Sequence, residues 1–137
     1  GLKIAIACTF VAHGLFAMGL IYLPGYFVDM TIKILGVNET QATVFLYVVG
    51  VLDLITSVLI FIPKVAKYAL LYMMFWGFAT AFARLLAGFN SDFFSMSIHN
   101  NTFLVIYRLS HGLLPLIVLV MEEKYRKQLI KLPTNEN

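Results

Sequence analysis

Four long apolar runs dominate this chain and limit what it can fold into. They cover residues 4–23, 43–62, 66–89 and 102–121. Each is close to the roughly 20 residues that an α-helix needs to cross a bilayer. Because 61% of the 137 residues are hydrophobic, a soluble domain of this size could not bury so much apolar surface. The runs therefore predict an all-α membrane protein, an antiparallel bundle of four transmembrane helices with the lipid bilayer as its partner.

The segments between the runs predict the rest of the architecture. Residues 26–36 mix apolar side chains with Asp29 and Lys33, which indicates a short interfacial helix between the first two spans. Asn38 and Gln41 have the spacing of a capping box that opens the second span. Residues 90–101 predict an external loop, and residues 122–131 continue the last helix into the cytosol. Residues 1–131 thus form a single bundle, and residues 132–137 are expected to be a disordered tail.

The basic residues lie in three places that four spans would bring to one side of the membrane. They precede the first span, separate the second from the third and follow the fourth: Lys3, Lys64, Lys67, Lys124, Arg126, Lys127 and Lys131. Positive residues collect on the cytoplasmic face, so both termini are predicted to be cytoplasmic. The net charge of +3 follows from this topology, and it indicates no nucleic-acid partner.

Three ionisable side chains on different predicted spans lie at a common depth. His13 is ten residues after Lys3, Asp53 ten before Pro63, and His111 ten before Met121. At 1.5 Å per residue, all three lie about 15 Å from the cytoplasmic boundary, near the midplane. Ionisable groups at this depth usually face the interior of a bundle or a cavity. We therefore expect two imidazoles and one carboxylate to meet in one layer.

Other polar residues extend this predicted site. Arg108 lies one turn outside His111, Arg84 lies nearer the external side, and small residues such as Gly14 and Gly112 beside the histidines leave room for a ligand. The predicted ligand-binding residues are His13, Asp53, Thr56, Ser57, Arg84, Tyr107, Arg108 and His111. A structural interpretation is also open, in which the histidines are hydrogen-bonded scaffolding and Asp53 pairs with Arg84 or Arg108 to hold the bundle together.

Several chemistries could use such a site. His13 and His111 could be the axial ligands of a b-type haem, or could bind a metal ion together with Asp53. A quinone head group would need only a hydrogen-bond donor at each carbonyl. Asp53 and the histidines could instead relay protons in a carrier, and a non-catalytic helper that binds other membrane subunits is a further class. No P-loop, dinucleotide or nucleophile-elbow motif is present, so whether the chain is an enzyme stays open.

One helix face is predicted to be a packing surface. Gly77, Ala81 and Gly88 recur on the third span at spacings that place small residues on one side of a helix. Such rows let membrane helices approach closely.

The layout resembles the DoxX-like family of small four-helix membrane proteins. The resemblance rests on "AHG" in the first span with Gly19 beyond it, on the Gly50 to Asp53 pattern in the second span, and on the proline turn that follows. It implies a subunit or accessory of a membrane redox complex, including quinone-linked ones, or a helper role. The leading hypothesis is therefore a small membrane protein that binds a quinone, haem or lipid-like ligand at its midplane.

Overall fold

The computed structural model describes residues 1–22, 25–89 and 91–131, and within them the chain is helical with no strand. Three helices are long and apolar enough to cross a membrane, and the first helix is apolar but shorter. The predicted all-α class is therefore confirmed. The elements are α1 (Leu2–Ala17), α2 (Gly25–Leu35), α3 (Glu39–Leu59), α4 (Ala66–Ala87), the short 3₁₀ helix η1 (Ser91–Phe93) and α5 (Phe94–Lys131).

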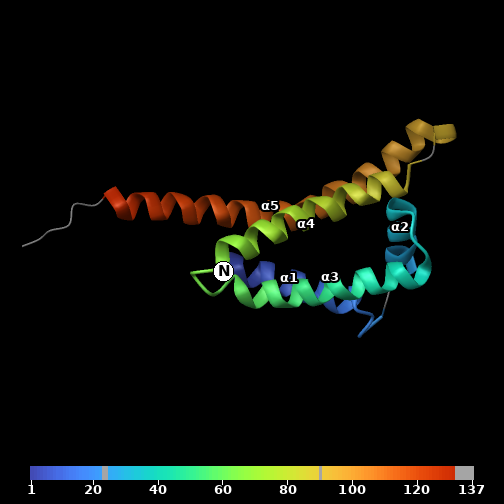
Figure 1. Ribbon diagram of the computed structural model, residues 1–137. Coiled ribbons are helices and arrows are strands. Elements are labelled where there is room, and N and C mark those ends of the chain that lie inside the picture. The colour runs from blue at the N-terminus through green and yellow to red at the C-terminus, as the bar shows by residue number, and fades with distance from the viewer. Residues whose placement is uncertain (23–24, 90, 132–137) are drawn as a thin grey trace, which may run out of the picture.

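The long helices are arranged as two pairs. α1 packs along α3, and α4 packs along α5, with far more contact within each pair than between them. We call these the α1/α3 pair and the α4/α5 pair. The turn at residues 60–65 joins the pairs at one end, and α2 lies across the opposite end, where it contacts both α3 and α4 (Figure 1). The two pairs are thus connected by the turn at one end and bridged by a short helix at the other.

Local sequence signals fix where α2 and α3 end and begin. Gly36 follows α2 with a φ of +65°, a left-handed conformation that glycine adopts without strain and that commonly ends a helix. The Gln41 N–H donates to the Asn38 side chain at 2.9 Å, and the Asn38 N–H donates to the Gln41 side chain at 3.2 Å. Both the predicted short helix and the predicted capping box are present.

The predicted external loop at residues 90–101 is wrong for most of its length. Ser91–Phe93 form η1, and α5 already begins at Phe94. Polar side chains in this stretch are held by the helices themselves, because the Asn101 amide donates to the backbone carbonyls of Ser97 and Gly88 at 2.7 and 3.0 Å. At its other end α5 runs through residues 122–131 as predicted, and the predicted tail at 132–137 lies outside the described residues.

Each pair is held at a glycine where two helix backbones meet. A Cβ added at Gly14 would lie 2.7 Å from the Gly50 carbonyl oxygen, across the contact of α1 with α3. A Cβ added at Gly77 would lie 2.5 Å from the His111 carbonyl oxygen, across the contact of α4 with α5. Real Cβ atoms do not approach this closely, so only glycine fits. The predicted packing role of Gly77 is therefore confirmed.

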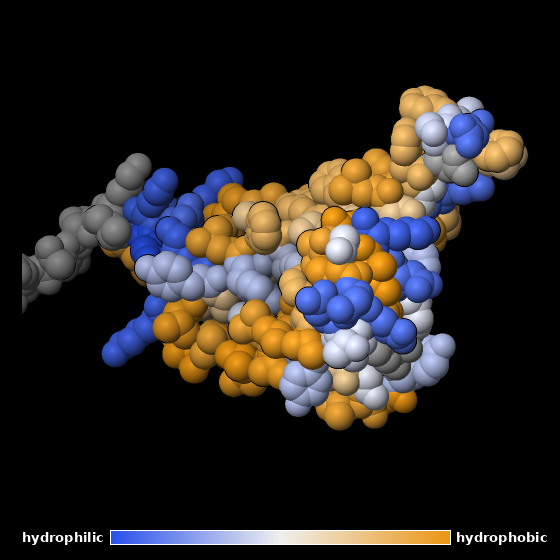
Figure 2. Space-filling model, turned by 45° about the vertical axis from the view of Figure 1, so that its right-hand side comes forward, coloured by the Kyte–Doolittle hydropathy of each residue, from blue (hydrophilic) through white to orange (hydrophobic). Residues whose placement is uncertain are grey.

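The surface is apolar between two hydrophilic ends. Large hydrophobic side chains point outward from every long helix, among them Phe75 and Phe103, which are 70% and 75% exposed. Figure 2 shows these apolar side chains over the middle of one face and hydrophilic ones toward each end. At one end, Lys3 pairs with Glu122, and Lys67 lies 3.2 Å from Glu123. These ion pairs place the start of α1, the start of α4 and the charged part of α5 together.

Candidate functional site

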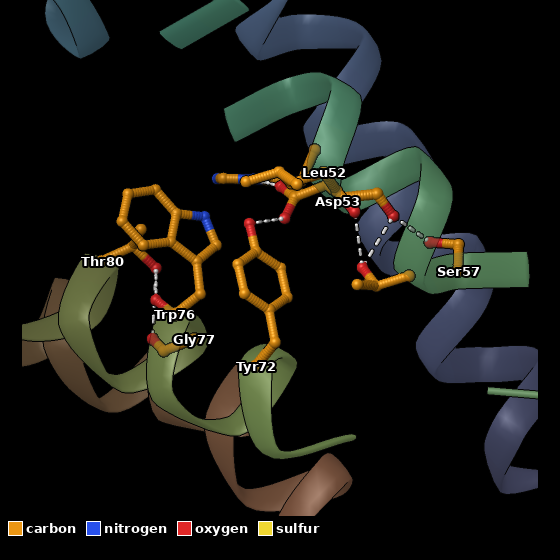
Figure 3. Close-up of polar contacts among 9 residues, drawn as sticks. Leu52, Asp53, Ser57, Tyr72, Trp76, Gly77 and Thr80 are labelled. Atoms are coloured by element: carbon orange, nitrogen blue, oxygen red, sulfur yellow. Dashed lines mark hydrogen bonds and ion pairs between the residues drawn. The ribbon is translucent and has the colours of Figure 1, made fainter. Parts of the chain in front are cut away.

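Asp53 is the centre of a buried network that links three helices. Its side chain, on α3, is 0% exposed. One carboxylate oxygen lies 2.8 Å from Nδ1 of His13 on α1, and the other accepts a hydrogen bond of 3.1 Å from the Tyr72 hydroxyl on α4 (Figure 3). The predicted meeting of His13 and Asp53 is therefore correct. Because Tyr72 belongs to the α4/α5 pair, the network also bridges the two pairs.

Thr56 and Ser57 lie near Asp53 but do not extend the site. The Thr56 hydroxyl donates to the Leu52 carbonyl at 2.8 Å and to the Asp53 carbonyl at 3.2 Å, and the Ser57 hydroxyl donates to the same Asp53 carbonyl at 2.6 Å. A hydroxyl on a helix readily bonds back to the preceding turn. The predicted polar stripe on this span is therefore used within α3, and not for a ligand.

His111 does not join the predicted layer of two imidazoles and a carboxylate. It lines a separate cavity of about 280 Å³ between α1 and α5, together with Tyr107 and Ser110. Its Nδ1 lies 3.5 Å from the Ser110 hydroxyl, and Tyr107 is 74% exposed. Depth along a helix does not fix the direction in which a side chain points, which is why a comparison of depths alone could not predict the contacts of His111.

The glycines beside the two histidines have a different role from the predicted one. Gly14 packs against Gly50, and Gly112 packs under the Phe78 ring, where an added Cβ would lie 2.7 Å from the ring. Both glycines are buried. They bring helices together and leave no space for a ligand.

A cavity of about 160 Å³ lies between the two helix pairs, beneath α2. Its size is close to that of an engineered apolar cavity of about 150 Å³ that binds benzene. Every long helix and α2 contribute to its largely apolar lining. The polar side chains among the lining residues are His13, Thr31, Trp76, Thr80 and Arg108.

One of these side chains keeps a buried hydrogen-bond donor without a partner among the described residues, and another is a cation that forms no ion pair there. The hydroxyls of Thr31 and Thr80 donate to backbone carbonyls at 2.8 and 3.0 Å. By contrast, Nε1 of Trp76 is buried and has no hydrogen-bond partner in the part of the chain described, and the Arg108 guanidinium lies 5.5 Å from the Phe27 ring centroid. Buried donors are normally paired, so the Trp76 indole N–H on the wall of this cavity is available to whatever enters it.

The predicted pairing of Asp53 with Arg84 or Arg108 does not form. Among the described residues, the ion pairs involve Lys3, His13 and Lys67, and no arginine. Arg84 instead lies over the Tyr26 ring of α2, 4.7 Å from its centroid, and its buried Nε has no partner within residues 1–22, 25–89 and 91–131. Asp53 is satisfied by an imidazole and a phenol, which leaves both guanidinium groups without a counter-charge.

This arrangement does not fit a haem or a metal ion held by the two histidines. His13 and His111 line different cavities, and His13 already uses Nδ1 toward Asp53. The central cavity holds about one ring and not a porphyrin. No three His, Cys, Asp or Glu side chains of the described residues are grouped as metal ligands.

Sequence reasoning missed Tyr72 as a member of the network and Trp76 as a cavity residue. Figure 3 shows both projecting from α4 toward Asp53. Tyr72 lies nine residues after Pro63, while Asp53 lies ten before it. The depth comparison that selected Asp53 would therefore have selected Tyr72 as well, had hydroxyl groups been included with the ionisable ones.

No family model, curated protein or solved structure matches the chain. The functional argument therefore depends on the geometry of the cavity and its lining residues.

Proposed function

We propose that this protein binds a hydrophobic small molecule in the cavity between its two helix pairs, through a head group that accepts hydrogen bonds. A quinone ring and a lipid-like amphiphile are the two ligand classes of this kind. The observation that carries the proposal is the buried Nε1 of Trp76, which has no hydrogen-bond partner among the described residues, on the wall of an apolar cavity that Arg108 also lines. Ligand sites in proteins are mostly apolar, with a few polar groups that orient the ligand.

The proposal includes a topology of four antiparallel spans with both termini in the cytoplasm. The 16 residues of α1 are about 24 Å long, and apolar residues follow it through Tyr22. The grouping of Lys3, Lys67 and the charged end of α5 at one end supports a cytoplasmic assignment for that end.

The topology is tested by labelling single cysteines in intact cells with a membrane-impermeant maleimide. In a Cys8→Ser background, Phe93→Cys should react from outside and Tyr125→Cys only after lysis. Labelling of Tyr125→Cys in intact cells would overturn the orientation.

The ligand site is tested by the fluorescence of Trp76, the only tryptophan of the chain. Titration of the detergent-purified protein with a ubiquinone analogue carrying a ten-carbon tail should quench this fluorescence in a saturable way. Ala79→Leu fills the cavity wall and should abolish saturation, while Ala12→Leu, on the exposed face of α1, should not. Quenching that rises linearly and equally in all three proteins would show partitioning into detergent and no site.

A proton-coupled carrier is the second candidate, and the His13–Asp53–Tyr72 network favours it. Asp53 is fully buried and hydrogen-bonded to two groups that can exchange protons, an arrangement used in proton relays within membranes. Asp53→Asn should then abolish pH-driven uptake into proteoliposomes. Uptake that is independent of pH in the unaltered protein would count against this function.

The resemblance to DoxX-like proteins adds a proposed setting for the first function, a subunit or accessory of a membrane redox complex. The Trp76 donor in the cavity supports a ligand of the quinone class in such a complex, and it does not require that this chain itself catalyses a reaction.

A further inference from the structure

A cation that forms no ion pair among the described residues lines the central cavity, and it bears on the charge of the ligand. Arg108 lines the cavity. Arg84 and Arg108 lie over the rings of two consecutive residues of α2, 4.7 Å from the centroid of Tyr26 and 5.5 Å from that of Phe27. Arg108 is 13 residues before Met121, which places it about 20 Å from the cytoplasmic end and within the outer half of the bilayer. Charged groups within a membrane are usually paired, so the Arg108 guanidinium calls for an anion.

The described part of the chain does not supply that anion. Asp53, the one carboxylate near the midplane, already accepts from His13 and Tyr72. Asp29 is exposed on α2 and lines a different cavity at the end of the molecule. No carboxylate of the described residues lies within 4.0 Å of either guanidinium. The aromatic rings of Tyr26 and Phe27 lie beside the two cations, but a ring carries no net charge.

We infer that the ligand of the central cavity is an anionic amphiphile, whose negatively charged head group lies against Arg108 and whose apolar chain fills the space between the helix pairs. A carboxylate or a phosphate would accept several hydrogen bonds from one guanidinium. The indole N–H of Trp76, on the same wall, would supply another donor. This inference rests on the proposed ligand site and selects, between its two ligand classes, the lipid-like one over the neutral quinone.

Three chemically matched probes test the charge of the head group. Trp76 fluorescence is measured with dodecanoate, dodecyl phosphate and dodecanol in neutral detergent at pH 8, where the acid is ionised. Both anions should bind at least ten times more tightly than the alcohol, which corresponds to about 1.4 kcal/mol. Equal affinity for dodecanol and dodecanoate would overturn the inference and leave the proposed site standing. A lack of saturable change with these probes and with the quinone would overturn the site itself.

Variants of Arg108 test whether this residue causes the preference for an anionic head group. Arg108→Gln should reduce the preference for dodecanoate over dodecanol to less than threefold, while Arg108→Lys, which keeps the charge, should retain most of it. Arg126→Gln, in the exposed charged part of α5, is the matched control and should keep the full preference. An unchanged preference in Arg108→Gln would contradict the assignment, and the comparison of probes on the unaltered protein tests the charge even if that variant fails to fold.

Nanodiscs distinguish the two sources of such an anion. If the ligand is a bilayer phospholipid, phosphatidylglycerol nanodiscs should block the dodecanoate response and phosphatidylcholine nanodiscs should not. If it is a free single-chain amphiphile, dodecanoate should bind equally in both. Either result keeps the anionic head group, whereas a response to dodecanol equal to that to dodecanoate in both discs would contradict it.

Discussion

The two histidines of this protein lie in nearly identical sequence contexts but in different environments. His13 and His111 are each followed by a buried glycine at a close helix–helix contact. Only His13 has a carboxylate partner, and only His13 lines the central cavity. The difference arises outside the motif, because Asp53 on α3 faces His13, whereas His111 forms no ion pair among the described residues. A local motif therefore specifies how helices approach, and a residue on another helix specifies what the histidine does.

The largest difference between the two regions is expected when each histidine is removed. His13→Ala leaves the buried Asp53 carboxylate with Tyr72 as its one remaining side-chain partner, and breaking a buried pair on one side costs about 3 kcal/mol of stability. His111→Ala removes a weakly bonded side chain and should cost less than about 1 kcal/mol. Unfolding by added denaturing detergent, followed by circular dichroism, measures both. Equal losses would remove the distinction between the two regions.

Substitution of the glycine at each helix contact should cause a similar loss of stability in the two helix pairs, and the loss should be of intermediate size. Gly14→Ala and Gly77→Ala both force a Cβ against backbone atoms, and overpacking of this kind costs about 1–3 kcal/mol. Gly25→Ala is the control, since an added Cβ there meets nothing within 4 Å. The same unfolding assay applies. If either contact variant is as stable as Gly25→Ala, the helices do not meet as described.

The smallest structural change, the loss of one hydroxyl group, should also separate the two regions. Tyr72→Phe removes a donor to the Asp53 carboxylate, and a hydrogen bond to a charged group is worth about 1.5–3 kcal/mol. Tyr107→Phe removes an exposed hydroxyl and should change stability by less than about 0.5 kcal/mol. Thermal unfolding in detergent measures the pair. A larger effect at Tyr107 would show that the polar network lies on the other side of α5.

Much of the fold follows from patterns that act locally in the sequence. Apolar runs, the Asn38 capping box and the stop at Gly36 predict the helices because each depends on residues within a few positions of one another. The predicted start of α5 is too late, because the polar residues near Asn101 resemble a loop in composition. The Asn101 side chain instead donates to the backbone carbonyls of Ser97 and Gly88, which belong to or adjoin helices.

The candidate site was predictable in depth but not in direction. Counting residues from the membrane boundary placed His13 and Asp53 together, and the same count would have added Tyr72. It could not tell that His111 faces another cavity or that Asp53 would leave Arg108 unpaired, since these depend on how each helix is rotated about its axis. Rotation is set by the glycine contacts between α1 and α3 and between α4 and α5, which only the packed structure reveals.

The most direct test of the difference between the two histidines is a pair of double-mutant cycles with Asp53. Stability is measured for His13→Ala, His111→Ala and Asp53→Ala, and for each histidine variant combined with Asp53→Ala. Residues in contact couple by about 0.5–3 kcal/mol, while distant ones add within about 0.5 kcal/mol. The structure predicts a coupling energy of at least about 1.5 kcal/mol between His13 and Asp53. Between His111 and Asp53 it predicts a coupling energy of no more than about 0.5 kcal/mol. Equal coupling of both histidines to Asp53 would contradict it.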